Sequence, residues 1–431
     1  MKIILSIALL SSLTLLIYCC GSTSKQISNH EDYDKYLTIK TNASKDFAEG
    51  EIDFWQKKYD FAPNQISYLS PLAANFSKLF ENTGDVKYLY KAEKLLLKSN
   101  ESYKYSGVGT IRALARNYIS QHRFREAFEL ANKAFAIGEG MKETQKLLFD
   151  VNMELGNYNK AGENLDFLKD STDFDYLIRL SKWSDHKGDL PTAISLMEKA
   201  KDIAIQNENK GLQIWTFSNL GDLNGHAGII KESYDYYLRT LALEPNCSYA
   251  LKGIAWIVFS HEKNAKEAKR IIDEISQSHH TPDFYLLKAQ IAEYEGNATE
   301  KEKNLTAYFN MLSAIDYGAM YNKYNALIYA DNKATAGKAI EIAKVEIEHR
   351  PTPDSYDLLA WSYYSIGEVQ KALEIEQQYV VGKSFEPNLN YHLAAIYKAN
   401  NLEKQVIPIK KELLNSVFEL GPLMEQKIKS L

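Results

Sequence analysis

Apolar residues along most of the chain recur at steps of three and four positions, in runs of about 12 to 16 residues. This spacing places apolar side chains on one face of a helix. Each run is followed by a short turn containing Gly, Asn or Asp and then by a second run of the same kind, whereas the strict alternation typical of half-buried strands is hardly seen. The pattern predicts an all-α fold built from paired helices.

The paired runs repeat with a regular period. When the segments are aligned on the residue about five positions after each turn, a small residue usually stands there. Successive anchors lie 32 to 40 residues apart, with a mean of about 35. The anchors are Ala92, Ala127, Ala161, Ala193, Ser233, Ala268, Lys301, Ala339, Ala372 and Val406. The alignment therefore predicts about ten copies of one unit over residues 66–415.

Individual copies share their small and large positions. Copy two contains Ala115, Tyr118 and Ala127, and copy nine, "LLAWSYYSIGEVQKALEIEQQYV", contains Tyr363 and Ala372 at equivalent places. With a period near 34 residues, these copies resemble tetratricopeptide repeats. The resemblance implies a right-handed α-solenoid of about ten helix-turn-helix repeats, in which the first helix of each repeat lines the concave side. Stacked copies bury one continuous core that no single copy could bury.

The segments outside the repeats are expected to cap or tether the solenoid. Residues 46–65 resemble half a repeat and precede copy one. Residues 416–431 have few apolar positions, which suits a C-terminal capping helix. Residues 20–45 are polar and lack a helical apolar period, so they are expected to form a tether.

The N-terminus has the pattern of an export signal. Lys2 precedes the apolar stretch from Ile3 to Tyr18, which is too short for a membrane span and is followed at once by Cys19 and Cys20. This resembles a bacterial lipoprotein signal, which implies a signal peptide over 1–19 and lipidation of Cys20. Modification of Cys19, a plain signal peptide and an uncleaved anchor remain alternatives. Gly21 after Cys20 favours the outer membrane, with the chain facing the periplasm or the cell surface.

Composition and motifs narrow the function classes. The chain has 51 basic and 56 acidic residues, a net charge of −5, which gives no argument for nucleic acid. Standard phosphate-binding, zinc-protease and hydrolase motifs are not found, so we expect no enzyme, cofactor or metal. The adjacent His279 and His280 have no further ligand nearby in the sequence, and we interpret them as loop histidines.

The resemblance also implies where a partner binds. In tetratricopeptide domains, ligands contact first-helix positions that repeat packing leaves exposed. Transferring that register gives candidates on the concave face: Arg112, Arg116, Asp222, Tyr324, Asp357, Trp361, Tyr364 and Tyr391. The arginine pair would attract an acidic segment and the aromatic group an apolar or extended peptide. The alternative for the aromatic residues is packing between neighbouring helices.

These observations favour a non-catalytic scaffold or assembly factor that binds a protein or peptide and is anchored to a bacterial membrane by its N-terminal lipid. An outer-membrane nutrient-binding lipoprotein with tetratricopeptide-like helices is the alternative. That alternative requires long aromatic-bearing insertions between repeats, and the spacing of the anchors leaves little room for them. An enzyme with an unfamiliar site is a third and weaker hypothesis.

Overall fold

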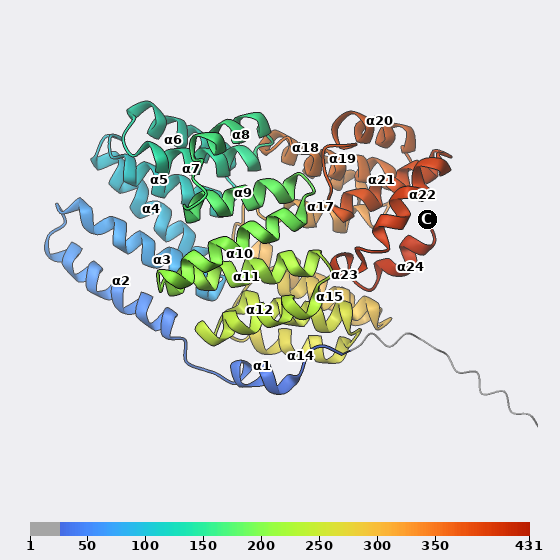
Figure 1. Cartoon of the computed structure of the whole chain (residues 1–431), viewed down its shortest axis with the longest axis horizontal. Coiled ribbons are helices and arrows are strands. Elements are labelled where there is room, and N and C mark those ends of the chain that lie inside the picture. Colours follow the sequence, from blue (N-terminus) through green and yellow to red (C-terminus); the bar gives the residue numbers. More distant parts are fainter. Residues whose placement is uncertain (1–25) are drawn as a thin grey trace, which may run out of the picture.

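Residues 26–431, the part of the chain described by the computed structural model, contain helices as their regular elements. Figure 1 shows these helices in chain order. The first twelve are α1 (His30–Leu37), α2 (Ala43–Phe61), α3 (Leu69–Thr83), α4 (Lys87–Ser102), α5 (Val108–Ser120), α6 (Phe124–Ile137), α7 (Met141–Glu154), α8 (Tyr158–Phe167), α9 (Phe174–His186), α10 (Leu190–Gln206), α11 (Lys210–His226) and α12 (Ile230–Leu243). The others are α13 (Ser248–Trp256), α14 (Ala265–Ile275), α15 (Asp283–Tyr294), α16 (Ala298–Ala314), α17 (Asn322–Ala330), α18 (Ala336–His349), α19 (Pro353–Ser365), α20 (Val369–Tyr379), α21 (Pro387–Ala399), α22 (Glu403–Leu413), α23 (Val417–Leu420) and α24 (Met424–Lys429). A 3₁₀ turn, η1 (Ile66–Tyr68), precedes α3, and a π-helical turn, η2 (Ile257–His261), extends α13.

The helices from α3 to α22 form ten successive pairs, which confirms the predicted tetratricopeptide-like, right-handed α-solenoid. Every anchor residue lies in the second helix of its pair. Nine of the ten anchors are at most 2% exposed, because the two helices of a pair approach most closely there. Lys301 is the exception: its side chain stays 33% exposed and pairs with Glu293 at 2.8 Å.

Glycines create the space between copies five and six. The ring of Tyr237 on α12 packs between Gly221 of α11 and Gly253 of α13. A Cβ atom at either glycine would lie closer than 3.0 Å to that ring. The small first-helix residue thus has the packing role that the repeat resemblance implied.

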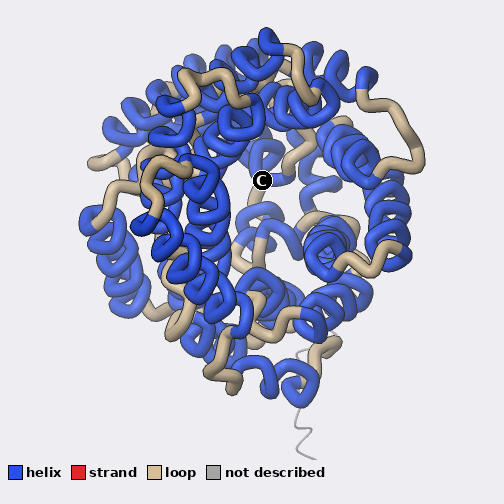
Figure 2. Tube along the Cα trace, turned by 90° about the vertical axis from the view of Figure 1, so that its left-hand side faces the viewer, coloured by secondary structure: helices blue, strands red, loops and turns tan. Residues whose placement is uncertain are grey.

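The solenoid winds back on itself, so copies far apart in sequence touch. Viewed along the long axis, the helix pairs wind around that axis in a ring (Figure 2). The α3–α4 turn meets copies six and seven: the His280 backbone N–H donates to the Thr83 carbonyl at 2.6 Å, and Val86 and Leu89 share a core with Tyr308. These contacts join the first copy of the solenoid directly to copies six and seven.

The expected polar tether is wrong for residues 27–37. Tyr33 and Leu37 of α1 are 1% and 7% exposed and join the core formed by α12 to α15. The Glu262 carboxylate accepts the Ile27 and Ser28 backbone N–H groups at 2.8 and 2.6 Å. Buried Tyr33 and Leu37, together with hydrogen bonds from Tyr33 to Glu267 and from Arg270 to Asp34, dock this short helix.

The expected C-terminal capping helix is two short helices, α23 and α24. Gly421 separates them with φ of 88°, and the following Pro422 disfavours helical geometry at the residue before it. The Phe418 carbonyl accepts hydrogen bonds from Trp256 Nε1 at 3.1 Å and from Ser260 Oγ at 2.6 Å. The end of the chain therefore packs Leu420 and Ile428 on the core of copies nine and ten and also contacts copy six at α13 and its π-helical turn.

The N-terminal predictions fall mostly outside the described residues. The proposed signal peptide, 1–19, and Cys20 lie there and remain predictions. Over residues 26–431, no helix combines the length and the apolar character that a membrane crossing requires.

Candidate functional site

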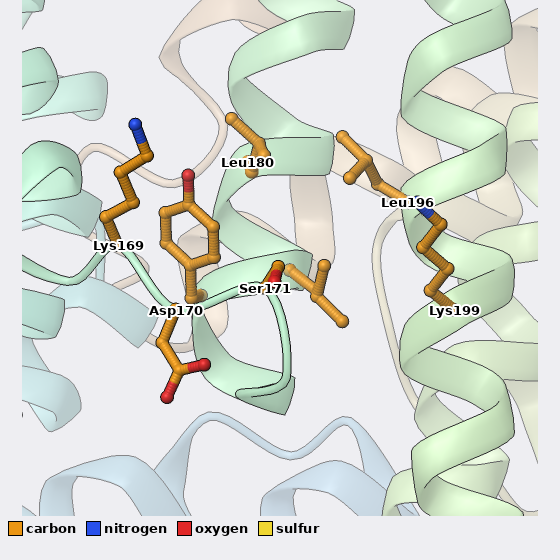
Figure 3. A pocket seen from close by; sticks show the side chains of 8 residues that line it. Lys169, Asp170, Ser171, Leu180, Leu196 and Lys199 are labelled. Carbon is orange, nitrogen blue, oxygen red and sulfur yellow. The ribbon is translucent and has the colours of Figure 1, made fainter.

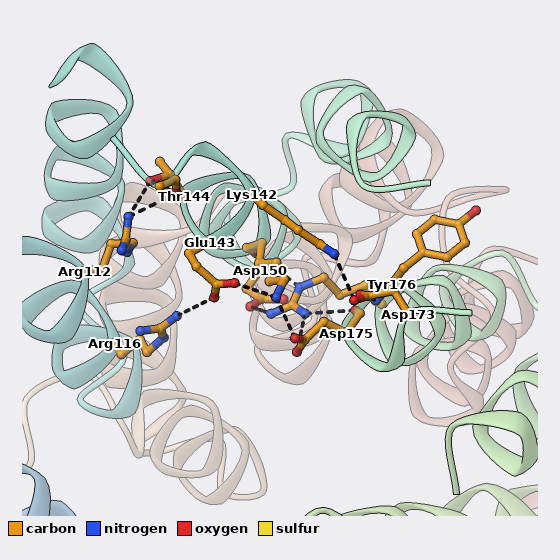
Figure 4. Close-up of polar contacts among 12 residues, drawn as sticks. Arg112, Arg116, Lys142, Glu143, Thr144, Asp150, Asp173, Asp175 and Tyr176 are labelled. Carbon is orange, nitrogen blue, oxygen red and sulfur yellow. Dashed lines mark hydrogen bonds and ion pairs between the residues drawn. The ribbon is translucent and has the colours of Figure 1, made fainter. Parts of the chain in front are cut away.

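The first helices of copies two, three and four carry a ladder of charged side chains (Figure 4). We call Arg112, Arg116, Glu143, Lys146, Asp150, Asp175 and Arg179 the charged ladder; they lie on α5, α7 and α9. Because successive first helices lie side by side, a charge on one helix meets its partner one repeat later. Positive and negative groups alternate across the three helices.

The centre of the ladder is tightly paired. Lys146 Nζ lies 2.6 Å from the Asp175 carboxylate and 2.8 Å from that of Glu143, and its side chain is 7% exposed. Burial alone would lower the pKa of Lys146, but its bonds to the two carboxylates outweigh burial and raise that pKa. The pKa of Asp175 is lowered: burial opposes this shift, and the hydrogen bond and charge of Lys146 dominate. These groups are charged at neutral pH and hold α7 against α9.

The two predicted arginines have different surroundings in the structure. Arg112 Nη1 donates to the Gly140 carbonyl at 3.2 Å and to Thr144 Oγ1 at 3.1 Å, so it clamps the start of α7. Arg116 has a side chain that is 55% exposed, and its guanidinium is 4.0 Å from the Glu143 carboxylate. Of the two arginines, Arg116 is therefore the one whose donors are free to meet a partner.

The ladder extends to a contact between distant copies. Lys182 pairs with Glu154 at 2.9 Å, and Arg350, which follows α18, reaches the same carboxylate at 3.4 Å. Arg350 also pairs with Glu346 at 2.6 Å. The ionic surface thus joins copies three and four to copy eight, across the winding of the solenoid.

The predicted aromatic residues of copies nine and ten lie together. The Trp361 ring stacks on Tyr364 at a centroid distance of 4.8 Å and on His392 at 4.0 Å, with Tyr391 at 6.1 Å. Trp361, Tyr364 and Tyr391 are all partly exposed. We call Trp361, Tyr364, Tyr391 and His392 the aromatic cluster. These rings are at once packed between helices and accessible at their edges.

Asp357 does not have the exposed position that the repeat register suggested. It is 3% exposed, and its carboxylate lies 2.8 Å from His392 Nδ1. The fully buried Glu376 of α20 is beside it, and neither Glu376 carboxylate oxygen has a hydrogen-bond partner among the described residues. Burial and then the Asp357 charge raise the pKa of Glu376 to about 9, and burial lowers the pKa of His392 to about 4. Asp357 is a buried structural residue, which corrects its assignment as a partner contact.

The two remaining candidates stand apart from these groups. Asp222 accepts hydrogen bonds from Tyr237, at 2.6 Å, and from Tyr249. Burial raises the pKa of Asp222. Tyr324 is 44% exposed and has its ring 6.1 Å from that of Tyr321. Asp222 therefore holds helices α11, α12 and α13 together, whereas part of the Tyr324 side chain is exposed to solvent.

A separate shallow groove lies between α9 and α10 (Figure 3). Its volume is about 600 Å³. Apolar side chains of Leu177, Leu180 and Leu196 form its base, and Lys169 and Lys199 lie at its edges. None of the sequence candidates lines this groove. Among residues 26–431, no three His, Cys, Asp or Glu side chains are grouped to hold a metal ion.

Of the charged ladder, the candidates on the concave face included only Arg112 and Arg116, although the sequence contained a signal for four of the other residues. Asp175 is 29 residues after Lys146, and Arg179 is 29 residues after Asp150. Opposite charges separated by about one repeat meet on adjacent first helices, and a search at that spacing would have found both pairs.

Comparison with known proteins finds only distant structural likenesses. No family model and no curated protein matches the chain. Similar solved structures include PilW, a type IV pilus biogenesis factor, at 17% identity over 48% of this chain and 92% of that one, with a TM-score of 0.38. Pseudomonas aeruginosa PilF is 17% identical over 49% and 92% of the two chains (TM-score 0.34), and yeast Tom70 is 14% identical over 92% and 94% (TM-score 0.37). Because these identities and TM-scores are low, the fold is assigned from the ten helix pairs of the chain itself. The fold defines a tetratricopeptide-like repeat protein.

Proposed function

We propose that this chain is a non-catalytic scaffold that binds an extended segment of a partner protein along its first helices. The observation that carries the proposal is Arg116. Arginine presents five N–H donors, and the single 4.0 Å contact to Glu143 leaves most of those of Arg116 free at the end of an otherwise tightly paired ladder. A carboxylate on the partner can bind such a guanidinium in a bidentate manner. An acidic side chain is thus the expected partner group.

The aromatic cluster supplies the apolar contacts in this proposal. Exposed edges of Trp361, Tyr364 and Tyr391, with the free face of Tyr324, offer contact area on side chains that lose little entropy when they bind. The packing of Trp361 between Tyr364 and His392 holds its ring in one orientation before a partner arrives. Pre-organised aromatic side chains are typical binding hot spots.

Short connections support a scaffold over a nutrient-binding protein. The longest links between helices α3 to α22, residues 276–282, 315–321 and 380–386, have seven residues each. A binding region carried on long insertions has no place in such links. This observation favours the helix surface itself as the binding element.

We further propose that a lipid on Cys20 anchors the scaffold to a bacterial outer membrane. The support is the apolar stretch that ends directly before Cys19 and Cys20. Mass spectrometry of the mature N-terminus tests this proposal. We expect a diacylated or triacylated Cys20, and an unmodified N-terminal residue further along the chain would contradict it.

Charge reversal at Arg116 tests the partner site. The full chain is used to capture partners from solubilised membranes, and the affinity of the recovered partner is then measured for wild type, Arg116→Glu and Arg125→Glu. Arg125 is an exposed arginine on the second helix of the same copy, so it is the matched control. We expect Arg116→Glu to weaken binding at least about tenfold, or roughly 1.4 kcal/mol, and Arg125→Glu to have little effect. Equal affinities of the two variants would refute this site.

A further inference from the structure

Helix α2 presents an apolar stripe to solvent. Phe47, Phe54 and Phe61 are 62%, 47% and 92% exposed, and they are spaced by seven residues. Residues seven apart lie on the same side of a helix, so the three rings form one line along α2. We call them the phenylalanine stripe. Ala48 is the one buried residue of this 19-residue helix, which packs its other side on α3.

The stripe lies where the solenoid has no further repeat to cover it. Figure 1 shows α2 at the edge of the molecule, beside α3. A terminal element of a repeat protein normally has a polar outer face, because no further repeat covers it. Exposed aromatic residues in a row at such a position indicate an interaction surface.

We infer that α2 pairs with α2 of a second copy in an antiparallel homodimer, with Phe54 near the two-fold axis. The seven-residue spacing then places Phe47 of each copy against Phe61 of the other. Antiparallel pairing also matches the charges. The first part of α2 is acidic on balance, with Asp46, Glu49, Glu51 and Asp53 against Lys45, and the last part is basic on balance, with Lys57 and Lys58 against Asp60.

One specific ion pair follows from this geometry. Glu51 and Lys58 lie on the same flank of the stripe, three positions before and four positions after Phe54. In an antiparallel pair, each Lys58 therefore faces Glu51 of the other copy. Gly50 lies on the opposite flank, and a Cβ atom added there would meet nothing within 4 Å. This leaves room for the second helix to approach closely.

Composition favours a second copy over a lipid surface. Helix α2 contains five acidic residues and three lysines. A helix that lies on a membrane typically has lysine and arginine on its polar face. The six rings of two copies can bury roughly 800 Å², given about 150–250 Å² for a full aromatic side chain, and lysine stems add to this area. This area lies at the low end for a specific complex, so we expect association at micromolar concentrations.

The mass of the full chain in a mild nonionic detergent tests the proposal by light scattering. We expect a dimer that dissociates on dilution to low micromolar concentration. Phe54→Glu should weaken dimerisation at least tenfold. Phe167→Glu on α8 is the matched control, because Phe167 is 57% exposed and lies outside the stripe. A wild-type chain that stays monomeric at about 100 μM, or equal behaviour of the two variants, would overturn the proposal.

Two further measurements test the orientation. Lys58→Glu should weaken the dimer, and adding Glu51→Lys to the same chain should restore it. Cysteine at position 54 should cross-link two copies on oxidation, above the background that the wild-type chain with its native Cys247 gives. Cysteine at 47 should cross-link to cysteine at 61 and not to itself, because the two positions 47 would lie about 20 Å apart along the helix. Self-cross-linking at 47 would indicate a parallel pair and overturn the antiparallel arrangement.

Discussion

The charged ladder and the aromatic cluster are built on the same part of the repeat, the first helix, and yet they respond to their surroundings in opposite ways. In the ladder, Lys146 and Asp175 remain charged because each has its counter-ion one repeat away. Beneath the cluster, Asp357 of α19 and Glu376 of the second helix α20 are buried side by side, and the pKa of Glu376 is raised to about 9. Salt should therefore affect the ladder, and pH should affect the cluster.

This difference shows what a repeat register specifies. The register fixes which positions of a helix face the neighbouring helix. The residues one copy away decide whether such a position is paired, exposed or buried. Asp150 pairs with Arg179 at 2.7 Å at a partly exposed position, whereas Asp357 contacts His392 within a packed core. Equivalent positions in successive repeats consequently have different chemistry.

The largest effect on stability is expected from breaking the centre of the ladder. Lys146→Met removes a nearly buried ammonium, so that Asp175 keeps only its 3.4 Å contact with Arg179 and Glu143 only its 4.0 Å contact with Arg116. We expect a loss of about 2.5 kcal/mol in the free energy of unfolding, less than the about 3–5 kcal/mol of a fully buried ion pair, because the two carboxylates are partly exposed. Urea unfolding measures this loss. Lys160→Met is the control, because its pair with Glu163 is exposed on both sides and should contribute less than about 0.5 kcal/mol.

A smaller effect, of opposite sign, is expected at the cluster. Above its ordinary pKa of 4.5, Glu376 ionises in the unfolded chain but keeps its proton in the folded chain until about pH 9. Rising pH therefore reduces stability between these values. Glu376→Gln removes this titration and lets an amide donate to Asp357. We expect the variant to be about 2 kcal/mol more stable than wild type at pH 8 and nearly equal to it at pH 4.5.

Thermal unfolding at several pH values measures this difference. Glu374→Gln is the matched control, because Glu374 lies on the same helix and is exposed. If wild type and Glu376→Gln lose stability with the same slope from pH 5 to pH 8, the buried protonated carboxyl is refuted.

The smallest effect is expected from salt. Raising NaCl from about 0.05 to 1 M shortens the screening length from roughly 14 Å to 3 Å and weakens exposed pairs more than buried ones. Backbone amides of α5, α7 and α9 should exchange with solvent about threefold to fivefold faster, a local loss near 1 kcal/mol. Amides of α19 and α21 should be unaffected. If salt accelerated amide exchange equally in both regions, the charged ladder would not depend on ion pairs more than the aromatic cluster does.

The fold could be predicted because the same helix-pair pattern occurs ten times, so a copy with an unclear pattern could be assigned from the others. Ten aligned anchors predicted ten helix pairs, and even Lys301, which departs from the small-residue pattern, lies in the expected second helix. The segments before and after the repeats occur once each, so no equivalent segment was available for alignment. Two buried side chains dock α1, and Gly421 with Pro422 divides the C-terminal segment, which a periodicity argument does not detect.

The candidate site could be predicted only in part. The aromatic residues Trp361, Tyr364 and Tyr391 do lie together, because they share a face of adjacent first helices. Asp357 could not be assigned from its own helix, since its burial depends on His392, 35 residues later, and on Glu376 of the intervening helix. The exposure of the Arg116 donors could not be assigned from the sequence either, because it depends on which arginine Thr144 and Gly140 bind. They accept hydrogen bonds from Arg112.

The central claim is that a partner protein binds at the open end of the charged ladder. The most direct measurement replaces Arg116, and in a second strain Arg125, with a photo-reactive amino acid in cells that make the protein. On irradiation, we predict a discrete cross-linked species at position 116 and none at position 125. Absence of any cross-link at 116, or the same cross-linked species at both positions, would contradict the account.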